Sequence, residues 1–92
     1  MDGFDEDEWA EMQEMYINHT NKELVSIMEN LENKSFDSLR TFGPNIKGSG
    51  GMYGFNEVTE IGAVIEAAAK DEDMTLIKSN LKDLDLFLKS KL

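Results

Sequence analysis

Apolar residues recur at steps of three and four along most of this chain, and this spacing constrains the fold more than any other feature. One series runs from Trp9 to Leu31, and another from Ile77 to Leu88. Residues spaced in this way share one face of an α-helix, whereas a half-buried strand would alternate apolar and polar residues. No such alternation occurs in the 92 residues. The sequence therefore predicts an all-α fold.

Four helical segments are expected, and the first covers about residues 8–32. The polar run Asn18–Asn21 could divide it, but one long helix is preferred. Another helix starts at Asn56, a favourable N-cap, and ends near Lys70. Asp71–Asp73 then closes this helix and opens the last one, whose predicted core positions are Ile77, Leu81, Leu84 and Leu88.

Short connections between these helices determine the predicted architecture. Connections of two to four residues favour antiparallel neighbours, so we expect an antiparallel up-down four-helix bundle. A chain of this length corresponds to one domain, covering residues 1–92, with residues 1–8 as a flexible acidic lead.

The second helical segment conflicts with local helix propensity. Ser35 is a suitable N-cap and Phe36 begins the apolar series, but Pro44 and several glycines follow. An interior proline costs about 3 kcal/mol relative to alanine, and each interior glycine costs about 1 kcal/mol. Local sequence alone therefore predicts a break after Phe42 and a new turn that starts at Pro44.

Composition excludes several classes of function. The net charge of −10 argues against binding to nucleic acid or to anionic membranes. The chain has no cysteine, no apolar run long enough to span a membrane, and an acidic start unlike a signal peptide. We therefore expect a soluble, cytoplasmic protein. Its one locally positive stretch, residues 34–54, carries Lys34, Arg40 and Lys47 against a single acid, Asp37.

Catalytic and cofactor motifs are missing from the sequence. The glycine-rich run that starts at Gly48 lacks the P-loop lysine, because Phe55 stands in its place. The same run fails the dinucleotide fingerprint, because Tyr53 stands where a glycine is required. His19 is the only histidine, and it is expected to be a solvated residue. No enzyme activity, cofactor or metal site is therefore predicted.

One stretch, residues 42–55, carries a recognisable pattern. It resembles the motif of histidine-containing phosphotransfer (HPt) domains, H-x-(L/I)-K-G-(S/A), followed by small residues, a further glycine and an apolar residue. The matching residues are Ile46, Lys47, Gly48, Ser49, Gly51, Gly54 and Phe55. With its flanking helices, the resemblance extends over roughly residues 9–90. It implies a four-helix bundle whose second helix runs unbroken from about Phe36 to Gly54, with a kink at Pro44.

The chain departs from this family at the residue that carries its chemistry. The phospho-accepting histidine of the family stands three residues before the lysine, and this position is Pro44 here. Proline has no nucleophilic side chain and cannot form a phosphoramidate. The resemblance therefore implies a module of two-component phosphorelay signalling that binds a response-regulator receiver domain or a sensor histidine kinase without carrying phosphate.

The predicted partner-binding surface lies on the second helix. On a continuous helix, positions 44, 47, 48, 51 and 55 share one face, on which small residues would let a partner approach closely. The predicted partner-binding residues are Arg40, Pro44, Lys47, Gly48, Gly51, Met52 and Phe55. Two explanations of the glycines remain open: close packing between helices, and close approach of a partner.

The sequence also allows two alternative functions. The chain could be a phosphocarrier that uses His19, the only available histidine. It could also be a helical adaptor outside phosphorelay, which binds a partner through exposed Trp9, Met12 and Met15.

Overall fold

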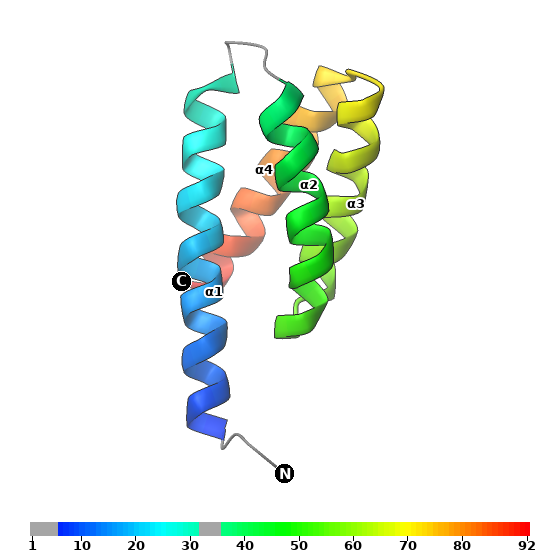
Figure 1. The fold of residues 1–92 in the computed structure, drawn as a ribbon. Coiled ribbons are helices and arrows are strands. Elements are labelled where there is room, and N and C mark those ends of the chain that lie inside the picture. The colour runs from blue at the N-terminus through cyan, green and yellow to red at the C-terminus, as the bar shows by residue number, and fades with distance from the viewer. Residues whose placement is uncertain (1–5, 32–35) are drawn as a thin grey trace.

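The computed structural model describes residues 6–31 and 36–92 and is helical over most of them (Figure 1). Its elements are α1 (Glu6–Glu29), α2 (Phe36–Gly50), the 3-10 turn η2 (Gly51–Tyr53), α3 (Asn56–Lys70) and α4 (Met74–Lys91). These described residues form no strand. The prediction of an all-helical chain with four α-helices is therefore confirmed.

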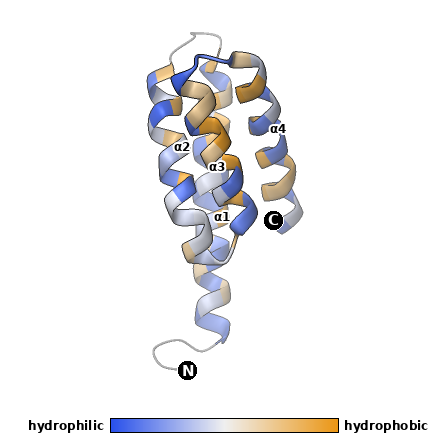
Figure 2. Cartoon of the chain, turned by 90° about the vertical axis from the view of Figure 1, so that its right-hand side faces the viewer, coloured by the Kyte–Doolittle hydropathy of each residue, from blue (hydrophilic) through white to orange (hydrophobic). Residues whose placement is uncertain are grey.

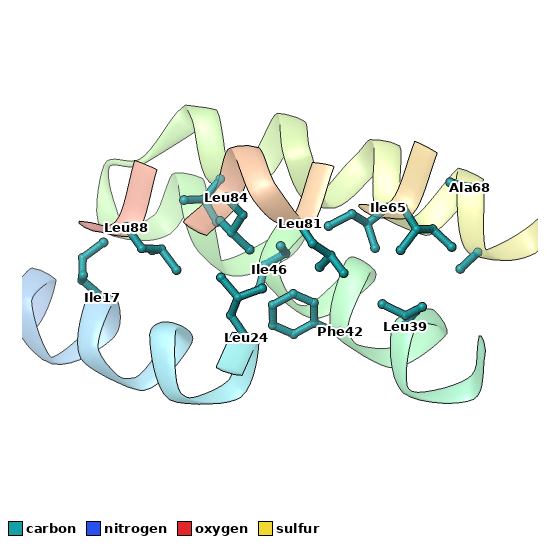
Figure 3. Close-up of a cluster of buried hydrophobic side chains, with 13 residues drawn as sticks. Ile17, Leu24, Leu39, Phe42, Ile46, Ile65, Ala68, Leu81, Leu84 and Leu88 are labelled. Atoms are coloured by element: carbon teal, nitrogen blue, oxygen red, sulfur yellow. The ribbon is translucent and has the colours of Figure 1, made fainter. Parts of the chain in front are cut away.

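A single apolar core lies among the four helices (Figure 3). Its larger side chains are at most 3% exposed and come from every helix: Ile17 and Leu24 from α1, Leu39, Phe42 and Ile46 from α2, Val58 and Ile65 from α3, and Ile77, Leu81, Leu84 and Leu88 from α4. All four predicted core positions of α4 are buried. Ile17 was not among the predicted core positions of the first helix, although it is buried.

Helix α1 is a single helix, as preferred from the sequence. The polar run does not divide it, because Asn18 and His19 face solvent while Thr20 packs into the core. The helix begins at Glu6, two residues before the predicted start, and residues 1–5 of the predicted lead lie outside the described residues. In Figures 1 and 2 the N-terminal part of α1 extends past the ends of the other helices.

Helix α2 passes through Pro44 without a break. The break predicted from local propensity is wrong, because Phe42 and Ile46, on either side of the proline, are both buried in the core and hold the segment helical. The continuous helix implied by the family resemblance is confirmed as far as Gly50. The kink at Pro44 stays a prediction, and the proposed cap Ser35 lies outside the described residues.

The connection between α2 and α3 departs from the prediction. The α-helix ends at Gly50 and the 3-10 turn follows, so helix α2 does not continue to Gly54. Gly54 is left-handed, with φ of 86°, a conformation that glycine adopts without strain. The N–H of Phe55 then donates to the carbonyl of Gly50 at 2.8 Å.

Phe55 occupies the N-cap position of α3, so the prediction that Asn56 is the N-cap is wrong. Asn56 is instead the first residue of the helix.

The turn between α3 and α4 agrees with the prediction. Asp71 occupies the C-cap of α3, and Asp73 caps α4 by accepting a hydrogen bond from the backbone N–H of Leu76 at 3.1 Å. Between them, Glu72 adopts a left-handed conformation with φ of 54°. None of the helices in the described ranges combines the length and the apolar character that crossing a membrane requires.

Candidate docking face on helix α2

Helix α2 packs most closely on α3, and glycines make this contact possible. A Cβ added to Gly43 would lie 2.8 Å from the backbone nitrogen of Glu66. A Cβ added to Gly50 would lie 2.7 Å from the backbone nitrogen of Thr59. Real Cβ atoms do not approach backbone this closely, and both glycines are buried. For these two residues, helix packing is the reason for glycine.

Gly48 is in the opposite situation. It is exposed, and no atom of the described residues would lie within 4 Å of a Cβ built on it. Glycine in a helix interior costs about 1 kcal/mol relative to alanine, and nothing in the packing around Gly48 requires it. The two explanations that the sequence left open therefore apply to different residues, since packing accounts for Gly43 and Gly50 but not for Gly48.

Pro44 lies one turn before Gly48 on the same stripe of α2, and Arg40 lies one turn before Pro44. Pro44 is half-buried, while Arg40 and Gly48 are exposed. Lys47 is at the edge of this stripe nearest α3, and its side chain is half exposed. We call these four residues, Arg40, Pro44, Lys47 and Gly48, the open face of α2.

The three remaining predicted site residues lie beyond the end of α2. Gly51 and Met52 belong to η2 and are exposed, Met52 by 75%. Phe55 does not share their surface, because its ring packs between Tyr16 and Phe87. The prediction that position 55 continues the helical face is wrong, since α-helical periodicity ends at Gly50.

A ladder of aromatic rings joins α1 to the end of α2. The ring centroids of Tyr16 and Tyr53 are 4.5 Å apart and stacked, and Trp9 stacks on the other end of the ladder, 6.3 Å from Tyr53. The hydroxyls of Tyr16 and Ser49 form a hydrogen bond of 2.8 Å, and Gln13 donates to the carbonyl of Tyr53 at the same distance. These contacts hold η2 and the last turn of α2 against α1.

The sequence did not predict this ladder. The one local signal for it is that Trp9 and Tyr16, seven residues apart, lie on the same side of α1. The ladder also weakens the adaptor hypothesis, because Trp9 is partly covered by Tyr53 and Met12 is half-buried. Of the three residues proposed for that surface, Met15 is the most exposed, at 71%.

The cations of the open face are paired with acids. Lys47 Nζ lies 3.0 Å from Glu66 Oε1, on α3. Arg40 reaches Asp37 at 3.2 Å and Glu72 at 3.1 Å. The locally positive stretch that the sequence suggested is therefore neutralised in the fold by acids of α3 and of the turn after it. Lys34, the third cation of that stretch, lies outside the described residues.

A shallow groove runs beside the open face, between α1 and α2. Its volume is about 380 Å³, and it is lined by Glu23, Ser26, Ile27, Ser38, Thr41, Phe42 and Asn45. Asn45 directly follows Pro44, so the groove borders the open face on the side away from α3. Its lining combines polar side chains with the apolar side chains of Ile27 and Phe42.

His19 lies on α1 and takes no part in this site. Its side chain is 73% exposed, and Nε2 lies 3.2 Å from Glu23 Oε1. Within residues 6–31 and 36–92, no three side chains of His, Cys, Asp or Glu gather as metal ligands would.

Comparison with known proteins adds no relative: no protein-family model, no curated protein and no solved structure matches this chain. Its function is therefore inferred from the motif in residues 42–55 and from the contacts of α2 with its neighbours.

Proposed function

We propose that this chain is a non-phosphorylatable HPt-like module of two-component signalling. It is an antiparallel up-down bundle that works in the cytoplasm as a binding protein and not as an enzyme. It binds a receiver domain or a sensor histidine kinase through the open face of α2, and it does so without carrying phosphate.

Two features support the HPt-like architecture. The Lys-Gly-Ser sequence lies on the second of four helices, where the family places its motif. The course of the chain in Figure 1 also supports it, because the colour gradient runs in alternate directions along successive helices.

The open space around Gly48 gives the strongest support for a docking role of α2. Gly48 lies in the last turn of α2, where a glycine without a packing neighbour lowers helix stability and no contact in the fold compensates for it. It leaves bare backbone one turn after Pro44, so another protein can approach this part of α2 closely. This fits the role that small residues beside the phosphorylation site have in the family.

Lys47 supplies the electrostatic part of the proposal. A receiver domain presents an acidic pocket, and an ammonium group at the edge of the open face is complementary to it. Pro44 provides neither a nucleophile nor a titratable nitrogen, so the contact with the partner leads to binding without phosphoryl transfer. Such a module could sequester a receiver, shield its aspartate or hold two components of a pathway together.

The experiment is a binding screen against the receiver domains and kinase dimerisation domains of the same genome, by calorimetry. The test variant is Lys47→Ala, and the matched control is Lys78→Ala, which removes an exposed lysine from α4. Hydrogen bonds to charged groups contribute about 1.5–3 kcal/mol, so Lys47→Ala is expected to weaken binding roughly ten-fold or more. The control is expected to bind as the wild type does.

Absence of binding to every receiver and kinase, by a folded protein, would overturn the proposal. Binding that Lys47→Ala leaves unchanged, but that Met15→Ala removes, would transfer the function to α1 and favour the adaptor hypothesis.

A further inference from the structure

We propose that Glu66 is a positioning residue that holds Lys47 against α3 and thereby limits how tightly the open face binds an acidic partner. This inference rests on the proposed function and adds a residue that no part of the phosphotransfer motif contains. It follows from the way in which two glycine contacts and one ion pair lie together between α2 and α3.

The backbones of Lys47 and Glu66 are fixed opposite each other by a reciprocal contact. The missing Cβ of Gly43, on α2, would lie 2.8 Å from the backbone nitrogen of Glu66. The missing Cβ of Gly62, on α3, would lie 2.6 Å from the backbone nitrogen of Lys47. Gly43 thus lets α2 approach the backbone of Glu66, and Gly62 lets α3 approach the backbone of Lys47. Glu66 is therefore held in reach of Lys47 by the tightest packing between the helices.

The side chains complete this arrangement. Lys47 Nζ donates a hydrogen bond to Glu66 Oε1 at 3.0 Å, with the lysine side chain 50% exposed and the glutamate side chain 24% exposed. The hydrogen bond from Lys47 lowers the pKa of the Glu66 carboxyl from its usual range, so Glu66 is ionised at neutral pH. The ammonium is consequently directed towards α3 and is partly neutralised before any partner arrives.

A partner carboxylate can therefore bind Lys47 in one of two ways, and Glu66 opposes both. It can take Lys47 away from Glu66, which breaks the ion pair, or it can share the ammonium and accept a second negative charge nearby. Both lower the affinity. Because partly exposed ion pairs contribute modestly to stability, the effect is a two- to five-fold reduction in affinity, which tunes binding and does not block it.

The test compares Glu66→Gln with Glu60→Gln in binding to the receiver selected by the screen. Both changes remove one negative charge from α3 and keep the length and helix propensity of the side chain. Glu60 is exposed and has no ion pair within the described residues, so it serves as the matched control. Glu66→Gln is expected to bind two- to five-fold more tightly than Glu60→Gln. In a Lys47→Ala background the two changes are expected to have equal effects.

The outcomes separate this inference from the proposed function. If Lys47→Ala weakens binding but Glu66→Gln and Glu60→Gln bind alike, the docking face stands and the role of Glu66 is overturned. If Glu66→Gln improves binding equally with or without Lys47, the substitution acts by removing general charge repulsion, and the positioning role is again overturned. If no variant binds any receiver or kinase, both proposals fail. Urea unfolding of each variant establishes that the compared proteins are equally folded.

Discussion

Helix α2 carries glycine both on the side against α3 and on the open face, but packing requires glycine only on the side against α3. The side against α3 carries Gly43 and Gly50, whose missing side chains are required for the approach of the α3 backbone. The open face carries Pro44 and Gly48, which destabilise a helix interior without any compensating contact at Gly48. A glycine-rich helix must therefore be interpreted residue by residue, because only some of its glycines serve the fold.

The largest effect is expected on the packed side. In Gly43→Ala the new Cβ would lie 2.8 Å from the backbone nitrogen of Glu66 and 3.2 Å from the carbonyl oxygen of Gly62. Overpacking costs typically 1–3 kcal/mol, and a collision with backbone belongs near the top of this range, so a loss of about 3 kcal/mol is expected. Urea denaturation measures it.

The control for this change is Gly48→Ala, on the open face. It should raise the free energy of unfolding by up to about 1 kcal/mol, because helix propensity improves and nothing is displaced. Equal effects of the two substitutions would erase the distinction between the two sides of α2.

The next largest effect concerns Pro44. The proline has no N–H to donate to the carbonyl of Arg40, so Pro44→Ala restores a hydrogen bond and removes a steric conflict. A gain of about 2 kcal/mol is expected, less than the roughly 3 kcal/mol of an isolated helix because the packed core already holds α2 together. Thermal unfolding measures the gain. A loss of stability would show that the fold has adapted to proline at this position.

These expectations also show how far the sequence predicts the molecule. The core of α4 could be predicted because Ile77, Leu81, Leu84 and Leu88 follow helical spacing without a competing signal. The continuity of α2 could not be predicted from propensity, since packing against the rest of the core overrides the local preference at Pro44. It was predicted only through the family resemblance.

The rest of the site depends on contacts that are distant in sequence. Phe55 was misplaced because a 3-10 turn and left-handed Gly54 end the helical periodicity before it. The stacking of Trp9 on Tyr53 and the pairing of Lys47 with Glu66 join different elements, and no window of neighbouring residues identifies the partner in either contact. For the same reason, counting charges along residues 34–54 suggested a positive surface that the fold neutralises.

A smaller effect is expected at Ser49, at the border between the open face and α1. Burial raises the pKa of the Tyr16 phenol above 10.0, while the hydrogen bond with Ser49 lowers it in part. The folded state therefore holds this proton more tightly than the unfolded state does. The corresponding stability is fully present below pH 10 and is lost as the pH rises through the folded pKa.

Absorbance titration of Tyr53→Phe, in which Tyr16 is the remaining tyrosine, measures this pKa. A midpoint above that of the same variant in urea is expected, and a further rise is expected when Ser49→Ala is added. A folded-state midpoint at or below the unfolded one would refute the burial of this hydroxyl.

In the proposed function, Gly48 serves a partner and not the fold. The receiver affinity and the unfolding free energy of Gly48→Gln, measured on the same samples, test this assignment. Glutamine fits the open space and improves helix propensity, so stability is expected to remain equal or to rise by up to about 1 kcal/mol. Receiver binding is expected to weaken at least ten-fold, because the added side chain keeps the partner away from the backbone. Unchanged affinity in a stable Gly48→Gln protein would contradict the claim.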